Sequence, residues 1–415
     1  MDPITLLQGK RIVLGVTGSI ACYKAVDLAS KLTQAGAQVD TIMTDPAQKF
    51  VTPLTFQAVT GRSVYTSMWA SASGTDLPTH IAHVGLAEGA DLFAIIPATA
   101  DTLARLAGGF ASDLLSVTAL AARCPILVAP AMDGGMYANL AVQANLATLR
   151  SRGVLVVEPE VGRFASGLVG QGRLPETPAL LGAIRNALAR SGPLAGRHVV
   201  VTAGGTREAI DPVRYVTNRS SGKQGYALAQ AALDAGAQVT LITTVRTLPE
   251  PVGAQIVPVE SAVEMRDAVL AHAVDADADA LIMAAAVADY RPSSAADHKL
   301  KKIGDEGLSL ELVQNPDILL EVKARRAETH RPRAVVGFAA ESERAAEHGR
   351  DKLVRKGLDL LAANDISAAD AGFEVDTNRV ILISADGAEP LALMSKAAVA
   401  EAIVARVAQL LSRTD

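Results

Sequence analysis

The chain has 415 residues, a formal net charge of −5 at pH 7, and 49% hydrophobic residues of which few are aromatic. This length allows two or three domains with full cores, and the slight acidic excess argues against nucleic-acid binding as the main role. Two cysteines cannot form a disulfide framework, the apolar stretch 114–132 is interrupted by Arg123 and Pro125, and the N-terminus lacks a signal-peptide pattern, so we expect a cytoplasmic protein without a membrane span.

Apolar runs in the first half predict buried strands separated by helices. We expect strands at 12–16, 39–43, 92–97, 126–131 and 154–157, and helices at 22–34, 102–122 and 179–190. The Gly- and Pro-containing segment 191–196 then predicts a domain boundary.

The second half repeats the design of the first. Gly196 opens the same pattern as Gly9 and lies 187 positions after it, whereas the matching Ala35 and Ala235 are 200 positions apart. The second unit therefore has 13 additional residues before the end of its first helix. We expect further strands at 198–203, 238–243, 280–287, 334–338, 358–362 and 379–384, and helices at 261–274, 316–327 and 395–412.

Alternating strands and helices predict an α/β fold class with two doubly wound, Rossmann-like parallel-sheet domains, 1–190 and 191–415. Ligands in such sheets bind beyond the carboxyl ends of the strands. The loop 204–223 lies there and carries several arginines, Asn218 and Lys223 before a helix. Because free N–H groups and the helix dipole favour anions, this loop suits a triphosphate or a phosphorylated substrate.

Three motifs in the first half resemble the flavin-dependent cysteine decarboxylase family. They are GVTGSIACYK at 15–24, PATAD at 97–101 and PAM-x-x-x-MY at 130–137, and the resemblance covers about residues 8–185. It implies a flavodoxin-like domain that binds FMN near a subunit interface of a homo-oligomer. In that family the flavin oxidises a CH2–SH group, which creates the electron sink that loss of CO2 needs.

The resemblance also implies site residues. The implied FMN contacts are Gly18, Ser19, Thr44, Thr99, Ala100 and Met132. The spacing before PATAD places the catalytic base at His83, with His80 as the alternative. Two positions depart from the family pattern: Asp133 stands where an Asn is usual, and Ser166 stands where the proton-donating Cys is usual. A hydroxyl is a far poorer acid than a thiol, so another group or water could be the donor.

Motifs throughout the second half resemble phosphopantothenate–cysteine ligases. They include AAAVADYRP at 284–292, KLKK at 299–302, NPDI at 315–318, GFAAE at 337–341 and AND at 363–365. Together the halves resemble the bifunctional enzymes of coenzyme A biosynthesis. The implied reaction activates 4′-phosphopantothenate with CTP to an acyl-cytidylate, which the amine of cysteine attacks; the first half then decarboxylates the product to 4′-phosphopantetheine.

By this resemblance, Lys299 contacts the triphosphate and Asn218 orients the acyl intermediate, while Mg2+ offsets phosphate charge. The implied nucleotide contacts are Met283, Ala284, Ala285, Asp289, Pro316, Asp317, Ile318, Leu319, Phe338, Lys352 and Lys356. Interpretations without a functional role stay open. Lys299, Lys301 and Lys302 could be a solvated run of charge. Lys352 and Lys356 could form an exposed helix face, and Asp289 could cap a turn.

Two other functions are considered. The departures at Asp133 and Ser166 allow an active ligase with a flavin-binding but weakly active or regulatory first half. A two-domain nicotinamide dehydrogenase is the other alternative, but the chain lacks G-x-G-x-x-G and the acidic partner after the second strand.

Overall fold

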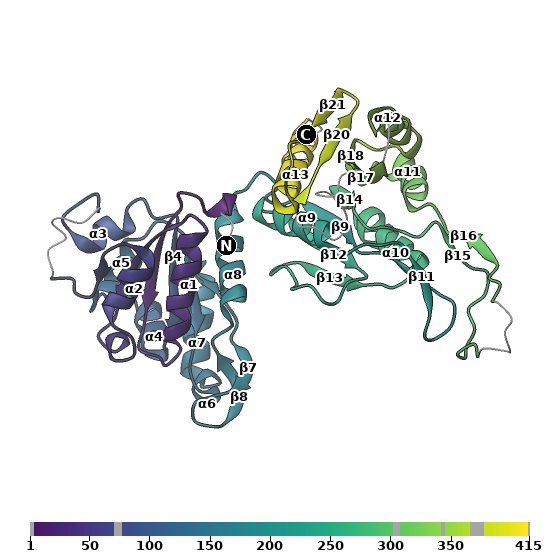
Figure 1. The fold of residues 1–415 in the computed structure, drawn as a ribbon. Coiled ribbons are helices and arrows are strands. Elements are labelled where there is room, and N and C mark those ends of the chain that lie inside the picture. The colour runs from purple at the N-terminus through teal and green to yellow at the C-terminus, as the bar shows by residue number, and fades with distance from the viewer. Residues whose placement is uncertain (1–3, 70–76, 302–307, 342–344, 366–376, 414–415) are drawn as a thin grey trace. The chain divides into compact units, whose positions relative to one another are not determined.

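The computed structural model describes residues 4–69, 77–301, 308–341, 345–365 and 377–413 (Figure 1). The chain divides into two compact units, Met1–Ala189 and Arg190–Asp415. Within the described residues, every helix is too short or too polar to cross a membrane.

Unit 1 contains a six-stranded parallel sheet with the order β3-β2-β1-β4-β5-β6. Its strands are β1 (Arg11–Val16), β2 (Gln38–Met43), β3 (Val64–Tyr65), β4 (Leu92–Ala98), β5 (Ile126–Pro130) and β6 (Leu155–Val156). From β1 the chain adds β2 and β3 on one side, returns to form β4 beside β1, and then adds β5 and β6 on the other side. This arrangement confirms the doubly wound fold and gathers the carboxyl ends of the strands at one edge.

Helices cover both faces of this sheet. They are α1 (Cys22–Gln34), α2 (Pro53–Thr60), α3 (Ala82–Ala87), α4 (Ala100–Gly108), α5 (Leu114–Ala121), α6 (Gly134–Tyr137), α7 (Leu140–Ser151) and α8 (Thr177–Ala189). Successive residues of β1 enter two different cores: Ile12 and Leu14 pack with α1 and α8, whereas Val13 packs with α3, α5 and α7. Burial on both faces explains why β1 reads as a continuous apolar run. A hairpin of β7 (Glu160–Arg163) and β8 (Val169–Arg173) precedes α8.

Unit 2 contains an eight-stranded sheet with the order β13-β12-β9-β14-β17-β18-β20-β21. Its strands are β9 (His198–Ala203), β12 (Gln238–Thr243), β13 (Gln255–Pro258), β14 (Ala280–Met283), β17 (Ala334–Glu341), β18 (Leu360–Asp365), β20 (Val380–Ser384) and β21 (Gly387–Pro390). The pairs β18–β20 and β20–β21 are antiparallel, and the other pairs are parallel. An antiparallel edge on a parallel sheet is common in this fold class.

The helices of unit 2 are α9 (Lys223–Asp234), α10 (Ala262–Val269) with its continuation η3 (Leu270–Asp275), α11 (Ile318–Thr329), α12 (Ala345–Lys356) and α13 (Lys396–Ser412). In the part of unit 2 that the structure describes there are also three two-stranded ribbons: β10 (Arg207–Ala209) with β11 (Tyr215–Thr217), β15 (Tyr290–Pro292) with β16 (Leu312–Gln314), and β19 (Thr377–Asn378) with β22 (Met394–Ser395). The first two ribbons project from the body of the unit (Figure 1).

The internal repeat is visible in both units. α1 and α9 are capped at their C-terminal ends by Ala35 and Ala235, and the next residues, Gly36 and Gly236, have φ of 102° and 92°. A positive φ at this position ends a helix and favours glycine. The additional residues of unit 2 fold as the β10–β11 ribbon between β9 and α9.

Two expected elements are shorter in the structure. The helix expected at 102–122 is divided into α4 and α5, because Gly109 has φ of 71° and the side chain of Asp113 caps α5. The strand expected at 280–287 ends at Met283, because the next residues bond to the loop after β9 instead of continuing the sheet. The short edge strands β3 and β13 were not predicted, since neither has a long apolar run.

Candidate active sites

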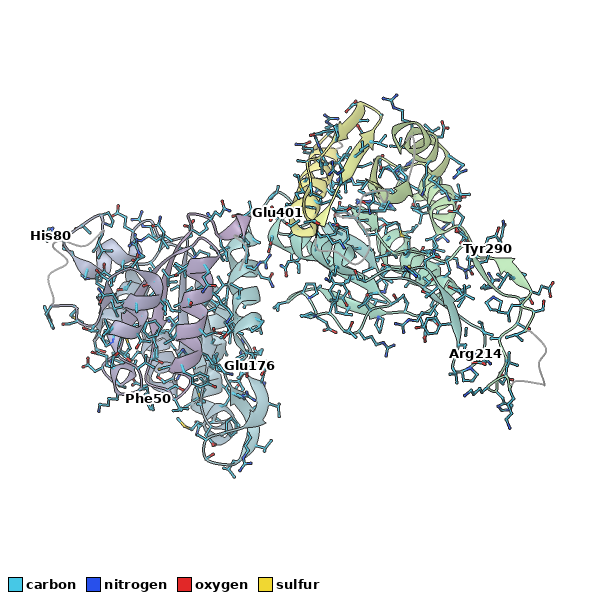
Figure 2. The ribbon with its side chains drawn as sticks, viewed as in Figure 1. Phe50, His80, Glu176, Arg214, Tyr290 and Glu401 are labelled. Carbon is cyan, nitrogen blue, oxygen red and sulfur yellow. The ribbon has the colours of Figure 1, made fainter. Side chains whose placement is uncertain are left out.

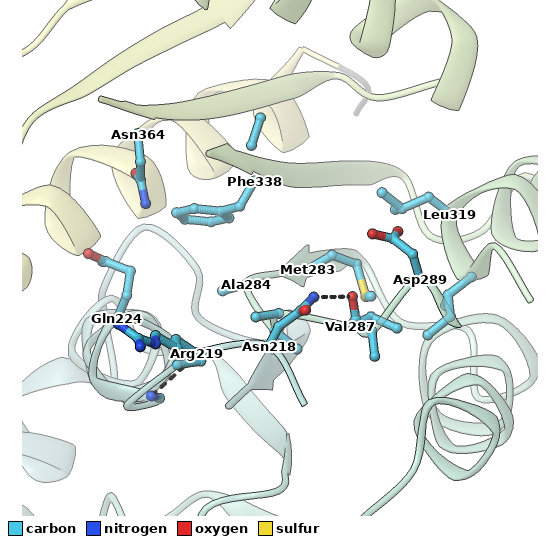
Figure 3. Close-up of a pocket in the computed structure, with 18 of the residues that line it drawn as sticks. Asn218, Arg219, Gln224, Met283, Ala284, Val287, Asp289, Leu319, Phe338 and Asn364 are labelled. Carbon is cyan, nitrogen blue, oxygen red and sulfur yellow. Dashed lines mark hydrogen bonds between the residues drawn. The ribbon is translucent and has the colours of Figure 1, made fainter. Parts of the chain in front are cut away.

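Unit 2 has a cavity of about 870 Å3 at the carboxyl edge of its sheet (Figure 3). The predicted residues that line it are Asn218, Met283, Ala284, Ala285, Asp289, Pro316, Asp317, Ile318, Leu319, Phe338, Lys352 and Lys356. These residues come from distant parts of the chain, and the parallel topology brings them together. Lys299 is exposed and is not among the residues that line the cavity, and Lys302 lies outside the described residues.

The loop that follows β14 forms one wall of this cavity and is held by the end of β9 and the loop that follows it. The backbone N–H of Ala285 donates to Thr202 Oγ1 at 3.1 Å, and that of Ala288 donates to Thr206 Oγ1 at 2.9 Å. Asn218 Nδ2 donates to the carbonyl of Val287 at 2.9 Å (Figure 3). The carboxamide of Asn218 is thus fixed at this wall of the cavity.

Gly205 is required where these two loops meet. A Cβ at this position would lie 2.4 Å from the carbonyl oxygen of Asn218, closer than real side chains approach. The absence of a side chain therefore allows the backbone of Asn218 to approach the end of β9.

Cationic groups gather where α11 begins. Lys356 forms an ion pair with Asp317 and is only 12% exposed, and Lys352 Nζ donates to the carbonyl of Phe338 at 3.3 Å. Asp317 also caps α11 by accepting from the N–H of Leu320 at 3.3 Å. Lys352 and Lys356 therefore face the cavity rather than forming a solvated helix face, and the start of α11 adds a positive dipole end. Anionic oxygens are favoured in this part of the cavity.

The polar lining residues that the sequence analysis did not single out include Gln224, Asn378 and Lys396, which join Asn364 of the AND motif. Asn378 Nδ2 lies 3.2 Å from Asn364 Oδ1 and 3.4 Å from Gln224 Oε1, and Gln224 Nε2 donates to the carbonyl of Lys396 at 3.1 Å. In Figure 3, Asn364 and Asp289 lie on opposite sides of the Phe338 ring. No sequence spacing predicts this network, because its members come from β18, β19, α9 and α13.

Unit 1 has a cavity of about 820 Å3, also at the carboxyl edge of its sheet. The predicted residues that line it are Gly18, Ser19, Thr44, Thr99, Ala100 and Met132. Thr17 connects two of the contributing loops, because its Oγ1 donates to the carbonyl of Pro97 at 2.7 Å and accepts from the N–H of Thr99 at 3.0 Å. The structure thus brings the GVTGSIACYK motif and the PATAD motif together in one site.

The predicted catalytic groups of unit 1 lie outside the lining of this cavity. His83 is half-buried on α3, His80 is exposed, and Ser166 is exposed on the β7–β8 hairpin. Ser166 Oγ donates to Asp133 Oδ2 at 3.1 Å. Within one unit, the flavin-type cavity and the candidate acid–base groups are therefore separate.

Tyr137, the last residue of the PAM-x-x-x-MY motif, is 7% exposed and donates to Glu158 Oε2 at 2.8 Å. Burial raises the pKa of Tyr137, and the hydrogen bond to Glu158 raises it further. Tyr137 is therefore a protonated donor that fixes the segment after β5. Among the described residues, no group of three or more His, Cys, Asp or Glu side chains could hold a metal ion.

Comparisons with known proteins agree with this division. Residues 3–189 match the family model described as Flavoprotein, and residues 194–411 match the one described as DNA/pantothenate metabolism flavoprotein C-terminal domain. The Coenzyme A biosynthesis bifunctional protein CoaBC of Vibrio vulnificus is 46% identical over 406 residues, 98% of this chain and 99% of that protein. The protein of the same name from Bacillus subtilis is 46% identical over 413 residues, 99% of each chain.

A crystal structure of the C-terminal domain of a CoaBC protein is 36% identical to this chain, covers 54% of it and all of that domain, and has a TM-score of 0.45. The fold and the two cavities define a two-unit α/β protein that joins a flavoprotein domain to a pantothenate-metabolism domain. The chain belongs to the family of coenzyme A biosynthesis bifunctional proteins.

Proposed function

We propose that unit 2 joins cysteine to 4′-phosphopantothenate with CTP, and that unit 1 decarboxylates the resulting 4′-phosphopantothenoylcysteine to 4′-phosphopantetheine. The observation that supports this proposal best is the cavity of unit 2. It gathers Asn218, the loop after β14 and the start of α11 with Lys352 and Lys356 around one space. Its volume is within the range of small-molecule sites.

The residues of the cavity suit nucleotidyl transfer. Lys352, Lys356 and the N–H groups at the start of α11 would bind phosphate oxygens, and the Asn218 carboxamide would hold the substrate carboxylate in line with the α-phosphate. Attack of that carboxylate gives the acyl-cytidylate and pyrophosphate, and the amine of cysteine then displaces CMP. Such reactions depend mainly on positioning and on cations that offset charge on phosphoryl oxygens. Lys299 would supply a further cation to the triphosphate.

Mg2+ fits this site only as a partner of the nucleotide. Among the described residues, the carboxylates in the lining are Asp289 and Asp317, and Asp317 is already paired with Lys356. Mg2+ commonly takes one or two carboxylates together with substrate phosphates. We therefore assign the ion to the triphosphate, with Asp289 as its nearest candidate protein ligand.

The cavity of unit 1 fits a flavin mononucleotide. The turn at Gly18 approaches Pro46 so closely that a Cβ would lie 2.3 Å from the Pro46 Cβ, and α1 begins without a side-chain cap. The N–H groups of Cys22 and Lys24 bond to the carbonyls of Ser19 and Ala21, so it is the positive end of the α1 dipole that favours a phosphate here. FMN would supply the oxidation of the CH2–SH group and its later reversal. His83 would take the thiol proton, and Asp133 and Ser166 would face the substrate carboxylate.

A homo-oligomer would bring the separate parts of the decarboxylase site together. Unit 1 exposes several large apolar side chains, including Tyr23 (61%), Trp69 (88%), Phe110 (62%) and Leu140 (86%). Aromatic side chains are more frequent in subunit interfaces than on the rest of a protein surface. We infer that unit 1 associates with further copies, so that the flavin lies near an interface with His83 or Ser166 of another subunit. Light scattering at several concentrations tests this association.

The whole proposal is tested by one turnover assay with 4′-phosphopantothenate, cysteine and CTP in the full-length chain. We expect pyrophosphate, the amide and its decarboxylated product. Purified protein that is colourless and indifferent to every nucleoside triphosphate would refute the proposal.

The second candidate, a ligase with a weakly active or regulatory unit 1, is favoured by the Asp133–Ser166 contact alone. Release of CO2 from supplied 4′-phosphopantothenoylcysteine, and its loss in His83→Asn, distinguishes the two candidates. Failure to release CO2 while the amide still forms would favour the second.

A further inference from the structure

The segment that carries Lys299 is attached to the turn of the β10–β11 ribbon on both sides of that lysine. The N–H of Ala296 donates to the carbonyl of Ile210 at 3.0 Å. The N–H of Leu300 donates to Asp211 Oδ2 at 3.1 Å, and the carbonyl of Leu300 accepts from Arg214 Nη2 at 2.7 Å. An ion pair therefore binds both backbone groups of the residue next to Lys299.

Asp211 is an unusually well-bonded carboxylate. Its Oδ1 accepts from the N–H groups of Val213 and Arg214, each at 2.8 Å, and its Oδ2 accepts from Arg214 Nε at 3.0 Å and Nη2 at 2.5 Å. The side chain of Asp211 is fully buried, whereas that of Arg214 is 42% exposed. The Arg214 guanidinium holds the pKa of Asp211 well below its usual range, so the carboxylate is ionised at neutral pH.

Lys299 depends on such an attachment because its own side chain is exposed. A lysine side chain has four rotatable carbon–carbon bonds, and the reach of its ammonium group is set by where its backbone is held. Small displacements of a positioned catalytic group lower rates strongly. Figure 2 shows Arg214 on the projecting part of unit 2, which lacks the support of the sheet.

We propose that Asp211 is a positioning residue for Lys299: with Arg214 it fixes the backbone at Leu300, so that the Lys299 ammonium can meet the nucleotide triphosphate. This inference rests on the proposed ligase function. Because Asp211 is buried, it acts without touching substrate, whereas Arg214 could also contact a substrate phosphate directly. Asp211 is therefore the position that tests the idea.

The experiment is a double-mutant cycle on CTP affinity, measured by titration calorimetry with the full-length chain and Mg2+. Lys299→Gln is expected to raise the Kd for CTP about tenfold, as loss of a charge-assisted contact does. Asp211→Asn is expected to raise it by a similar factor, and the double variant no further. A purely structural effect of Asp211 would add to that of Lys299, since effects at independent sites are additive. Asp267→Asn, which breaks the exposed pair with Arg266, is the matched control.

The outcomes separate the two levels of the proposal. If the unaltered chain binds no CTP, the ligase function fails; if Lys299→Gln leaves the Kd unchanged, the assignment of Lys299 fails. If Lys299→Gln weakens binding while Asp211→Asn has no effect, or an effect that adds, the positioning role is overturned. Should Asp211→Asn not fold, as judged by thermal unfolding, Asp211→Glu replaces it in the same cycle, because it keeps the charge beside Arg214 but moves the carboxylate that accepts from the Leu300 N–H.

Discussion

Ser166 Oγ donates a hydrogen bond to Asp133 Oδ2 at 3.1 Å, so the two positions that depart from the decarboxylase pattern contact each other. Asp133 Oδ1 at the same time accepts from the N–H of Gly135 at 3.0 Å and caps α6. Both carboxylate oxygens are therefore engaged. A carboxylate beside a hydroxyl replaces the amide and thiol of the family pattern, and the two substitutions are coupled through this bond.

The first prediction concerns this pair. Ser166→Cys together with Asp133→Asn should raise the rate of CO2-coupled product formation from supplied 4′-phosphopantothenoylcysteine, on the order of 10²-fold, because a thiol is a better general acid and an amide does not repel the substrate carboxylate. The rate change in the double variant should differ from the product of the two single-variant changes, since the side chains are in contact. Unchanged rates in all three variants would show that neither group acts on the substrate.

The second prediction concerns flavin binding. Gly18→Ala should purify without yellow colour, because its Cβ would lie 2.3 Å from the Pro46 Cβ and displace the turn. Ligation by unit 2 should continue at the original rate. The double variant with Pro46→Gly removes the clashing atom and should recover part of the flavin absorbance. A fully yellow Gly18→Ala protein would contradict the placement of the flavin phosphate at this turn.

The third prediction concerns the phosphate end of the unit 2 cavity. Lys356→Met should raise the KM for CTP by a factor of about 10 to 100, the cost of one charge-assisted hydrogen bond, and also leave Asp317 without its cation. The KM for CTP is measured by pyrophosphate release. Lys31→Met, which breaks an exposed ion pair with Asp27 in unit 1, is the control and should leave that KM unchanged.

The fourth prediction concerns pH. Lys24 is 4% exposed and its Nζ binds the carbonyl of Leu174 at 2.7 Å and Glu176 Oε1 at 2.9 Å, which ties α1 to the end of the β7–β8 hairpin. The hydrogen bond from Lys24 lowers the pKa of Glu176. A depressed carboxylate pKa stabilises the folded state above the unfolded pKa, and this stabilisation is lost as pH falls through the folded pKa.

Glu176→Gln should therefore lower the free energy of unfolding of unit 1 at neutral pH by about 0.5 kcal/mol, a small value because Glu176 is 55% exposed. The difference should be smaller at pH 3, because it is lost progressively as the pH falls through the lowered pKa of folded Glu176. Denaturant unfolding at both pH values measures it. Lys24→Met should cost about 2 kcal/mol, since it leaves a buried carbonyl unpaired. An equal effect of Glu176→Gln at both pH values would disprove the electrostatic origin.

Much of the fold could be predicted because its signals are local. Apolar runs such as 198–203 and 238–243 coincide with β9 and β12, since parallel strands are buried on both faces. The helix expected at 102–122 was wrong at its centre, where Gly109 and Asp113 interrupt it. The helix propensity of residues 102–122 as a whole led to the prediction of one helix, and the two local signals that interrupt it were given too little weight.

The candidate sites were predicted unevenly. Motif residues such as Thr99, Met283 and Phe338 line the expected cavities. The network of Asn378 and Lys396 was missed, because those residues enter the cavity from elements far along the chain.

The sequence by itself determined the two α/β units, their internal repeat and the residue types at the strand ends. Apolar strand runs, helix ends and glycine turns depend on residues that are close together in the chain. Only the tertiary structure decided that Ser166 contacts Asp133, that Asp211 and Arg214 bind Leu300, and that Lys299 lies outside the cavity lining. These relationships join residues 33 to 89 positions apart in the chain. Such pairings depend on how the loops fold back over the sheets, and no local pattern encodes them.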